Sequence, residues 1–427
     1  MSSSKVRVVL SVGAMKLIAL PLSIGLAVLL AKLLDVESYG KYAFIISLST
    51  ALALPAGQGI RELVLREVAL AVTSGDSVRI NEVWRISFRF YAVCNAVTLA
   101  ILMILCVSSW ALNAATDYQE VVIYSLILIP LVSVISLHAG VLQGLGRVAD
   151  SQLSPVLLRP LLSFLFVAAS IPFFWNYSLA SAFGMHLAAT VVSVVVSTCL
   201  VRRALGAARA IKSVSAVRSW ALPSSFQFIL ISATSVLSVE FGVLALGGLG
   251  LYEDAASLRV AQSASQLLLF PLFLNNIVLA PLMPGLVASH AIEVVEKKVL
   301  RHTKITFRAS FLIWLPLFIF ADELVSIAFG LEYAEHAVPA LRVLALGYLC
   351  NVFLGPASLV LTMTGHEKHA FSGQVVTLFV SVLLVVVLVS NFGATGAGIG
   401  IALGGVSGRL YLRSKCIRAV GLNPALL

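Results

Sequence analysis

Long apolar segments, separated by short polar stretches, follow one another through almost the whole chain. Most are about 20 residues long or longer, the length that a helix needs to cross the ~30 Å hydrocarbon core of a bilayer. The alternation predicts membrane-spanning helices at 8–33, 39–60, 84–110, 121–143, 153–174, 179–201, 223–247, 255–283, 307–329 and 339–363, followed by a helical hairpin that turns near 391–396. We therefore expect an all-α integral membrane protein with about twelve transmembrane helices.

One interior stretch, 202–220, separates two sets of about six apolar segments, and all of its charged residues are basic. These residues are Arg202, Arg203, Arg209, Lys212 and Arg218. Short loops rich in lysine and arginine remain cytoplasmic. The stretch predicts an N-terminal six-helix bundle at 1–201, a basic cytoplasmic linker at 202–220 and a C-terminal six-helix bundle at 221–427. Both termini are then cytoplasmic.

The other polar stretches alternate in charge as this topology requires. Two are interpreted as inner loops because of their basic residues; they contain Arg61, Glu62, Arg66, Glu67, Arg79 and Arg85 in the first half and Lys297, Lys298, Arg301 and Lys304 in the second. Two others are interpreted as outer loops, with Asp117 and Glu120 in one and Glu332 and Glu335 in the other. The pattern predicts the same orientation as the linker.

Composition excludes an ordinary soluble fold. The chain is 60% hydrophobic and 11% charged, and its mean hydropathy is +1.02. The net charge of +10 follows from the positive-inside bias, so we expect no nucleic-acid partner. The five cysteines are scattered, which favours neither a disulfide framework nor a metal site. The first apolar segment is long enough to remain as a helix rather than to act as a cleaved signal peptide.

The two halves share local sequence at matching places. Gly40-Lys-Tyr42 follows the first apolar segment, and Gly250-Leu-Tyr252 follows the seventh. Gly144–Arg147 and Gly365–Lys368 end the fourth and tenth segments, each with a glycine cap and then a cation. Because both halves start on the same side, this indicates a parallel repeat about an axis along the membrane normal. Alternatively, these motifs are simply residues that are common at helix ends in the membrane interface.

Several short motifs occur in a characteristic order over nearly the whole chain. They are Gly40-Lys-Tyr42 with Gly57-Gln-Gly59, Leu142-Gln-Gly-Leu-Gly-Arg147, Gly250-Leu-Tyr252-Glu-Asp-Ala255, Phe329-Gly-Leu-Glu-Tyr333 with Leu341-Arg-Val-Leu-Ala345, and Gly393-Ala-Thr-Gly-Ala-Gly398. On these, the chain resembles the polysaccharide-flippase branch of the multidrug/oligosaccharidyl-lipid/polysaccharide exporter superfamily, which includes the Wzx-type O-antigen flippases. The resemblance implies two six-helix lobes around a central cavity that move a lipid-linked oligosaccharide to the outer leaflet.

Basic residues inside the apolar segments are candidate substrate contacts, because an ionisable side chain at the bilayer centre costs roughly 2.5–3.5 kcal/mol on insertion scales. Lys16 lies within the first segment, and Arg89 and Arg159 lie near the predicted cytoplasmic boundary. Each of them could simply extend its charge to the interface. Arg89 and Arg159 predict a cationic surface that attracts a diphosphate, since guanidinium groups suit phosphate oxygens. Three more arginines are expected nearby, namely Arg61, Arg85 and Arg147.

The eighth segment has a polar face. Arg259, Gln262 and Gln266 are spaced at i, i+3 and i+7, which places them on one side of a helix. Such a face either binds sugars or holds two helices together by hydrogen bonds. Glu240, in the seventh segment, is the candidate for coupling to a proton or sodium gradient; its alternatives are the outer surface or a cationic partner.

The leading hypothesis is therefore a transporter that flips a polyprenyl-diphosphate-linked oligosaccharide by ion-coupled alternating access in the cell inner membrane. The expected partners are the lipid-linked glycan, the bilayer, and a glycan polymerase with chain-length machinery. No nucleotide-binding or metal-ligand motif occurs in the sequence, so we expect no cofactor and no enzymatic activity. The alternatives are a multidrug/cation antiporter of the same superfamily and a membrane-embedded glycan polymerase or ligase.

Overall fold

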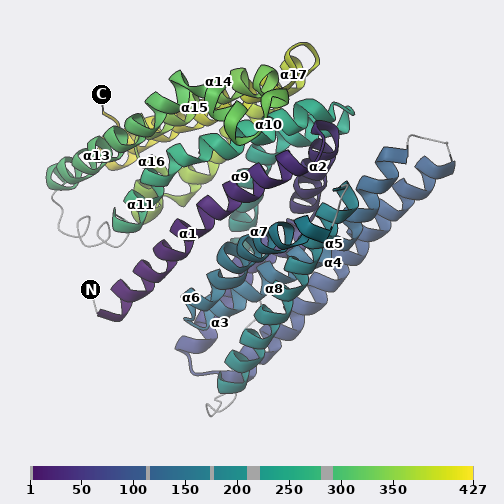
Figure 1. Cartoon of the computed structure of the whole chain (residues 1–427). Coiled ribbons are helices and arrows are strands. Elements are labelled where there is room, and N and C mark those ends of the chain that lie inside the picture. The colour runs from purple at the N-terminus through teal and green to yellow at the C-terminus, as the bar shows by residue number, and fades with distance from the viewer. Residues whose placement is uncertain (1–2, 112–115, 174–176, 209–221, 280–291, 427) are drawn as a thin grey trace. The chain divides into compact units, whose positions relative to one another are not determined.

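The computed structural model describes residues 3–111, 116–173, 177–208, 222–279 and 292–426, and these residues fold almost entirely into helices (Figure 1). The chain divides into two compact units. Unit 1 comprises Met1–Leu34 and Phe44–Ala233, and unit 2 comprises Asp35–Ala43 and Thr234–Leu427. The expected all-α membrane fold is confirmed. The greater part of the predicted basic linker, from residue 209 onward, lies outside the described residues.

Unit 1 contains the helices that precede the linker. They are α1 (Ser3–Leu33), most of α2 (Val36–Leu52), the π-helical turn η1 (Pro55–Gly59), α3 (Ile60–Thr73), α4 (Ser77–Ala111), α5 (Thr116–Gly144), α6 (Val148–Gln152), η2 (Leu153–Leu158), α7 (Arg159–Ser170), η3 (Ile171–Phe173) and α8 (Leu179–Ala208). One core cluster joins α3, α4, α5 and α8, with Val64, Val141 and Val201 among its buried residues.

Unit 2 begins with the first residues of α2 and continues from the middle of α9. Its helices are α9 (Leu222–Gly248), α10 (Tyr252–Ser265), η4 (Gln266–Leu269), α11 (Phe270–Leu279), α13 (Ile292–Ile319), α14 (Ala321–Ala328), η5 (Leu331–Tyr333), α15 (Ala334–Phe353), α16 (Ala357–Met363) and α17 (Glu367–Val420). Asp35 caps α2 by accepting a 3.0 Å hydrogen bond from the Ser38 amide. Burial raises the pKa of Asp35, but the Ser38 hydrogen bonds outweigh it and hold that pKa below its usual value.

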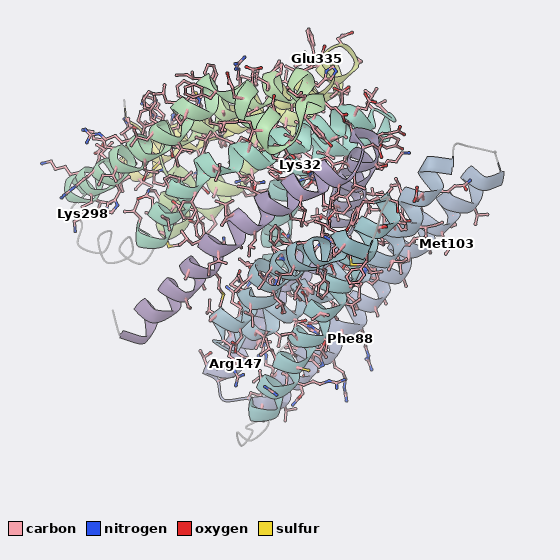
Figure 2. The ribbon with its side chains drawn as sticks, in the orientation of Figure 1. Lys32, Phe88, Met103, Arg147, Lys298 and Glu335 are labelled. Atoms are coloured by element: carbon pink, nitrogen blue, oxygen red, sulfur yellow. The ribbon has the colours of Figure 1, made fainter. Side chains whose placement is uncertain are left out.

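Eight helices in the described ranges are long and apolar enough to cross a membrane, and nine if α13 and α14, bent by 79°, form one span. The other spans that the sequence predicts correspond to α9, the α10–α11 segment and the second arm of α17. Apolar side chains also cover much of the surface. On α4, for example, Phe88 is 45% exposed and Met103 is 53% exposed (Figure 2). An apolar exposed surface of this extent is suited to lipid.

Two stretches expected to be inner loops are helical, which corrects the sequence prediction. Residues 60–73 form α3, so the turn before α4 is confined to Ser74–Asp76. Residues 292–319 form α13 and include the four lysine and arginine residues assigned to the second loop. The charges occupy one side of an amphipathic helix, and the other side is buried, as Val68 and Val299 illustrate.

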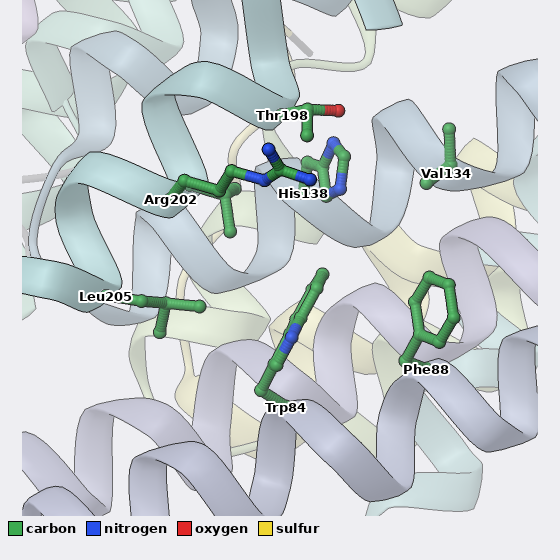
Figure 3. A pocket seen from close by; sticks show the side chains of 8 residues that line it. Trp84, Phe88, Val134, His138, Thr198, Arg202 and Leu205 are labelled. Atoms are coloured by element: carbon green, nitrogen blue, oxygen red, sulfur yellow. The ribbon is translucent and has the colours of Figure 1, made fainter. Parts of the chain in front are cut away.

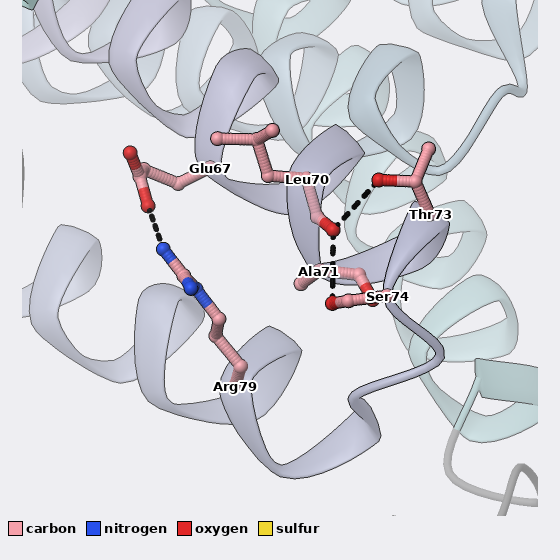
Figure 4. A network of polar contacts seen from close by, with 6 residues as sticks. All are labelled: Glu67, Leu70, Ala71, Thr73, Ser74 and Arg79. Carbon is pink, nitrogen blue, oxygen red and sulfur yellow. Dashed lines mark hydrogen bonds and ion pairs between the residues drawn. The ribbon is translucent and has the colours of Figure 1, made fainter. Parts of the chain in front are cut away.

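Helix α3 packs closely against α5 because glycines remove side chains from the contact. A Cβ on Gly140 would lie 2.7 Å from the Arg61 carbonyl oxygen, and one on Gly144 would lie 2.7 Å from Val68 Cβ. The turn that follows α3 is held by a buried ion pair at 2.7 Å between Glu67 and Arg79 (Figure 4). This pair neutralises an acid that is 2% exposed.

Helix α17 is a hairpin, as the sequence predicted. Gly393 has φ +49° and ψ −129°, which breaks the helix within the expected turn at 391–396. The Asp254 carboxylate accepts a 2.9 Å hydrogen bond from the Ala394 amide and so caps the second arm. Glycines at every fourth position line the contact between the two arms; they are Gly396, Gly400, Gly404 and Gly408.

Of the motifs that the two halves share, one pair has the same backbone structure and the other does not. Gly146 and Gly365 have φ of +79° and +80°. The following residues, Arg147 and His366, donate to carbonyls five residues earlier, so these two helix ends have the same geometry. Gly40 lies inside α2, whereas Gly250 lies in a turn with φ +75°. The two Gly-x-Tyr motifs are therefore not structurally equivalent.

Candidate functional site

The best-defined polar site in the described part of unit 2 is an ion pair between α9 and α10. Arg259 Nη2 lies 2.8 Å from Glu240 Oε2. The side chains are 18% and 16% exposed, so the charges are largely withdrawn from solvent without being sealed. Of the alternatives for Glu240, the structure selects the cationic partner. It also joins the proposed ion-coupling residue directly to a proposed substrate contact.

Gln262 lies one turn after Arg259 and is only 1% exposed. Its Nε2 donates a 3.0 Å hydrogen bond to the Val239 carbonyl of α9, which is the interhelical contact that one interpretation of this face predicted. Its Oε1, however, is buried and has no hydrogen-bond partner among the described residues. An orphaned buried acceptor of this kind indicates a missing water or ligand donor.

The predicted polar face of Arg259, Gln262 and Gln266 does not continue on one helix to its last residue. Helix α10 ends at Ser265, and a 3₁₀ turn begins at Gln266. Gln266 is exposed, in contrast to the buried Gln262. Farther along, on α11, both side-chain polar atoms of Asn275 and the Oδ1 of Asn276 are buried and unpaired within the described chain. These amides can exchange hydrogen bonds with hydroxyl groups such as those of a sugar.

Tyrosines from α2 lie beside the ion pair, a feature that the sequence did not reveal. Tyr39 and Tyr42 are near enough to Arg259 for an electrostatic interaction, and Tyr39 is 2% exposed. The Tyr39 ring meets that of Tyr333 edge to face, with centroids 6.1 Å apart. Gly40 permits the Tyr252 backbone to approach α2, where any side chain would collide with the Tyr252 carbonyl. In the sequence, only the short motifs that contain these tyrosines pointed to a role for them.

The other proposed substrate contacts lie in unit 1 and have separate surroundings. Lys16 on α1 is half-buried and experiences electrostatic repulsion from Arg61. Arg159, at the start of α7, is half-buried and has its Nη2 3.0 Å from His186 Nε2 on α8. Arg89 is exposed on α4.

The histidines of the described ranges do not form a metal centre. His186 is buried between Arg159 and Ser163, whose Oγ lies 3.4 Å from His186 Nδ1. This agrees with the packing role that is usual for a lone buried histidine. Among the described residues, no group of three or more histidine, cysteine, aspartate or glutamate side chains is arranged to hold a metal ion.

The family model for polysaccharide biosynthesis proteins matches residues 6–290, more than half of the chain. The chain belongs to this family. The match covers unit 1 from residue 6 onward as well as Glu240, Arg259, Gln262 and Gln266. It confirms the resemblance that the sequence motifs indicated. No curated protein matches the chain.

Solved structures of multidrug/oligosaccharidyl-lipid/polysaccharide (MOP) superfamily transporters share the fold. An inward-facing multidrug resistance MATE family transporter of that superfamily has a TM-score of 0.74 at 16% identity, covering 97% of this chain and 98% of that one. A MOP superfamily transporter from Pyrococcus furiosus Vc1, described by a reverse polarity of its binding pocket, has a TM-score of 0.65 at 15% identity over 96% and 95%. MATE in a bent conformation scores 0.60 at 18% identity over 97% and 98%.

These identities are low, so the likeness to solved structures shows the fold and not a substrate. The family contributes the link to polysaccharide synthesis, and the fold contributes the transporter architecture. Together they fit a membrane exporter of the polysaccharide-flippase type. The protein is a multi-pass membrane protein in contact with the lipid bilayer.

Proposed function

We propose that this protein flips a polyprenyl-diphosphate-linked oligosaccharide from the cytoplasmic to the outer leaflet of the cell inner membrane by ion-coupled alternating access. The observation that carries the proposal is the match to polysaccharide biosynthesis proteins over residues 6–290 in a chain with a transporter fold. The lipid-linked glycan is the transported substrate, and a glycan polymerase with chain-length machinery receives it. Both termini face the cytoplasm in this proposal.

Coupling rests on the exchange of partners at Arg259. While Glu240 is ionised, it occupies Arg259 Nη2 at 2.8 Å. Protonation of Glu240, or binding of sodium to its carboxylate, weakens this pair and leaves the guanidinium available to a phosphate oxygen. The diphosphate and the Glu240 carboxylate thus compete for Arg259, so binding of the coupling ion to Glu240 favours binding of the diphosphate. This linkage is what a gradient-driven cycle requires, because a ligand shifts an equilibrium only by its differential affinity for the two states.

Recognition of the substrate is divided between charges and amides. Lys16, Arg89 and Arg159 attract the anionic diphosphate on the loading side, where Arg159 offers the planar donor geometry that suits phosphate. The unpaired amide atoms of Gln262 and Asn275, together with the exposed Gln266, provide hydrogen bonds for the sugars. The lipid tail remains in the bilayer, where it needs no polar contact.

The alternative of a multidrug/cation antiporter has support from the MATE fold. A cationic substrate would favour unpaired carboxylates, whereas the Glu240 carboxylate already faces Arg259 in this structure. The proposed basic contacts also suit an anion better than a cation. The chemistry of the site therefore favours a diphosphate-bearing substrate.

The deciding experiment measures translocation of a labelled lipid-linked oligosaccharide in vesicles that contain the purified protein. Parental protein is expected to move the substrate faster under an imposed proton or sodium gradient. E240Q should retain substrate binding but lose this gradient dependence. R259K should keep part of the activity, because lysine preserves the charge but loses the guanidinium geometry.

R342Q is a matched control for these variants. It breaks a different ion pair in unit 2, at 2.7 Å between Arg342 and Asp322, whose side chain is 59% exposed. This variant should leave the gradient dependence of translocation unchanged. The double variant R89Q/R159Q tests recruitment and should lower the rate far more than E240Q lowers binding. If correctly inserted R89Q/R159Q moves substrate at the parental rate, these arginines set topology only. Translocation of a cationic dye but not of the glycan would support the antiporter instead.

A further inference from the structure

Unit 1 contains a cavity that the proposed transport cycle does not use. Its volume is about 630 Å³, and it lies among α4, α5 and α8 (Figure 3). The lining residues are Trp84, Phe88, Val134, His138, Thr198, Val201, Arg202 and Leu205. None of them is among the contacts proposed for the glycan substrate or the coupling ion.

The cavity is mostly apolar and aromatic, with a fixed polar wall. Trp84 and His138 stack with ring centroids 5.8 Å apart, and Phe88 follows Trp84 with centroids 5.8 Å apart. His138 Nδ1 lies 2.8 Å from Ser197 Oγ, which fixes the imidazole. A rigid lining of this kind favours a ligand with a long apolar part.

Arg202 supplies the charge of this cavity. It is the only charged side chain in the lining, its side chain is exposed, and no hydrogen bond or ion pair occupies it within the described part of the chain. It follows the predicted span 179–201 by one residue, so it lies at the expected level of the lipid headgroups. A single guanidinium matches one phosphodiester, since its donors can bind two oxygens of the same phosphate.

The cavity is also accessible from surfaces that suit acyl chains. Phe88, which lines it, is 45% exposed. Val195 lies one turn before Thr198 on α8 and is 56% exposed. In a membrane-spanning bundle such apolar surfaces face lipid, so a lipid molecule can enter from the bilayer with its chain along α4 and α8.

We propose that this cavity is a binding site for an anionic phospholipid of the surrounding membrane. The phosphodiester binds Arg202, and the part of an acyl chain nearest the headgroup packs against Trp84 and Phe88. Basic pockets between helices on the cytoplasmic side of membrane proteins are suited to anionic headgroups. The single cation distinguishes this site from a site for a diphosphate, which would need more positive charge. The bound lipid fills the space between α4 and α8 and holds these helices together.

The test uses the full-length protein with Trp84 as its one tryptophan, the other four (Trp110, Trp175, Trp220 and Trp314) being replaced by phenylalanine. The protein is reconstituted with brominated phosphatidylglycerol or brominated phosphatidylcholine at equal mole fraction. Bromine quenches a tryptophan that the lipid touches. We expect phosphatidylglycerol to be preferred about fivefold over phosphatidylcholine, the enrichment that one basic residue gives at an anionic membrane surface.

R202Q should abolish this preference, whereas R203Q should preserve it, because Arg203 is also exposed but does not line the cavity. Equal quenching by both lipids, or equal losses in R202Q and R203Q, would overturn the proposal. Polyprenyl phosphate added at low mole fraction should not displace the brominated lipid; displacement would instead assign the cavity to the carrier lipid. If the single-tryptophan protein does not fold, native mass spectrometry of otherwise unaltered parental, R202Q and R203Q proteins gives the same comparison of bound phosphatidylglycerol.

Discussion

Buried charges in this protein are stabilised by particular partners. Glu240 is paired with Arg259, and Glu67 is paired with Arg79. Arg159 Nη2 lies 3.0 Å from the Nε2 of His186. A charge in a membrane helix is costly unless it is paired or reaches water. The Glu67–Arg79 pair holds the turn that follows α3, whereas Arg259 and Arg159 contact residues of neighbouring helices.

Removal of Glu67, the buried acid of α3 that pairs with Arg79 across the α3–α4 turn, should destabilise unit 1. E67Q leaves Arg79, which is 20% exposed, without its counterion, and we expect a loss of about 3 kcal/mol in the free energy of unfolding. The matched control is D150N, which breaks an exposed 3.8 Å pair with Arg147 and should cost less than about 1 kcal/mol. Denaturation in detergent measures both. Equal effects of the two variants would contradict the structural role of Glu67.

Gln262 tests whether the polar face of α10 serves the substrate or the helix contact. Q262L removes the hydrogen bond to Val239, worth about 0.6 kcal/mol in a membrane bundle, and also removes the unpaired Oε1. We expect normal insertion and a glycan export rate reduced severalfold. S263A is the control, since that hydroxyl donates to the Arg259 carbonyl within its own helix. Normal export with a lower folded yield would support the helix-contact role.

Several spans are built from broken helices, and two of the breaks lie at or near a proline. Pro55 opens the π-helical turn before α3, and a 3₁₀ turn separates α10 from α11. Pro316 lies near the end of α13, just before its 79° bend into α14. Proline removes a backbone donor and disrupts the helix. A hydropathy pattern cannot reveal these breaks because the composition stays apolar across them.

The α17 hairpin should depend on its glycines. In G404A, the new Cβ would collide with Ser381 and with the Thr377 carbonyl on the opposite arm. Overpacking of this kind costs about 1–3 kcal/mol, so we expect a lower unfolding midpoint. G184A is the control because nothing lies within 4 Å of a Cβ at Gly184. An unchanged midpoint in G404A would mean that the arms can separate without cost.

The boundary between the two units does not follow the order of the chain, because a short segment near the N-terminus belongs to unit 2. Residues 35–43 belong to unit 2, although α1 and the rest of α2 belong to unit 1. The inserted segment contributes Tyr39, Gly40 and Tyr42 to the surroundings of Arg259. The site in unit 2 therefore requires residues from the beginning of the chain.

Membrane orientation is tested by reporter fusions. Reporters at Ser213 and Leu427, both outside the described residues, should report the cytoplasm because of the positive-inside rule. Reporters at Thr116 and Tyr333 should report the outside. A cytoplasmic signal at Thr116 would reverse the orientation and with it the proposed direction of transport.

The sequence by itself determined the membrane class, the approximate positions of the spans and the family, because hydropathy and motif order are properties of contiguous residues. It also located the turn of the α17 hairpin, where Gly393 takes a positive φ. It misjudged α3 and the start of α13 as loops, because charged residues at a membrane boundary also suit an amphipathic helix. Only the tertiary structure decided that Glu240 faces Arg259 and that Gly40 meets Tyr252. Contacts between distant segments depend on which helix faces meet, and local sequence does not encode this choice.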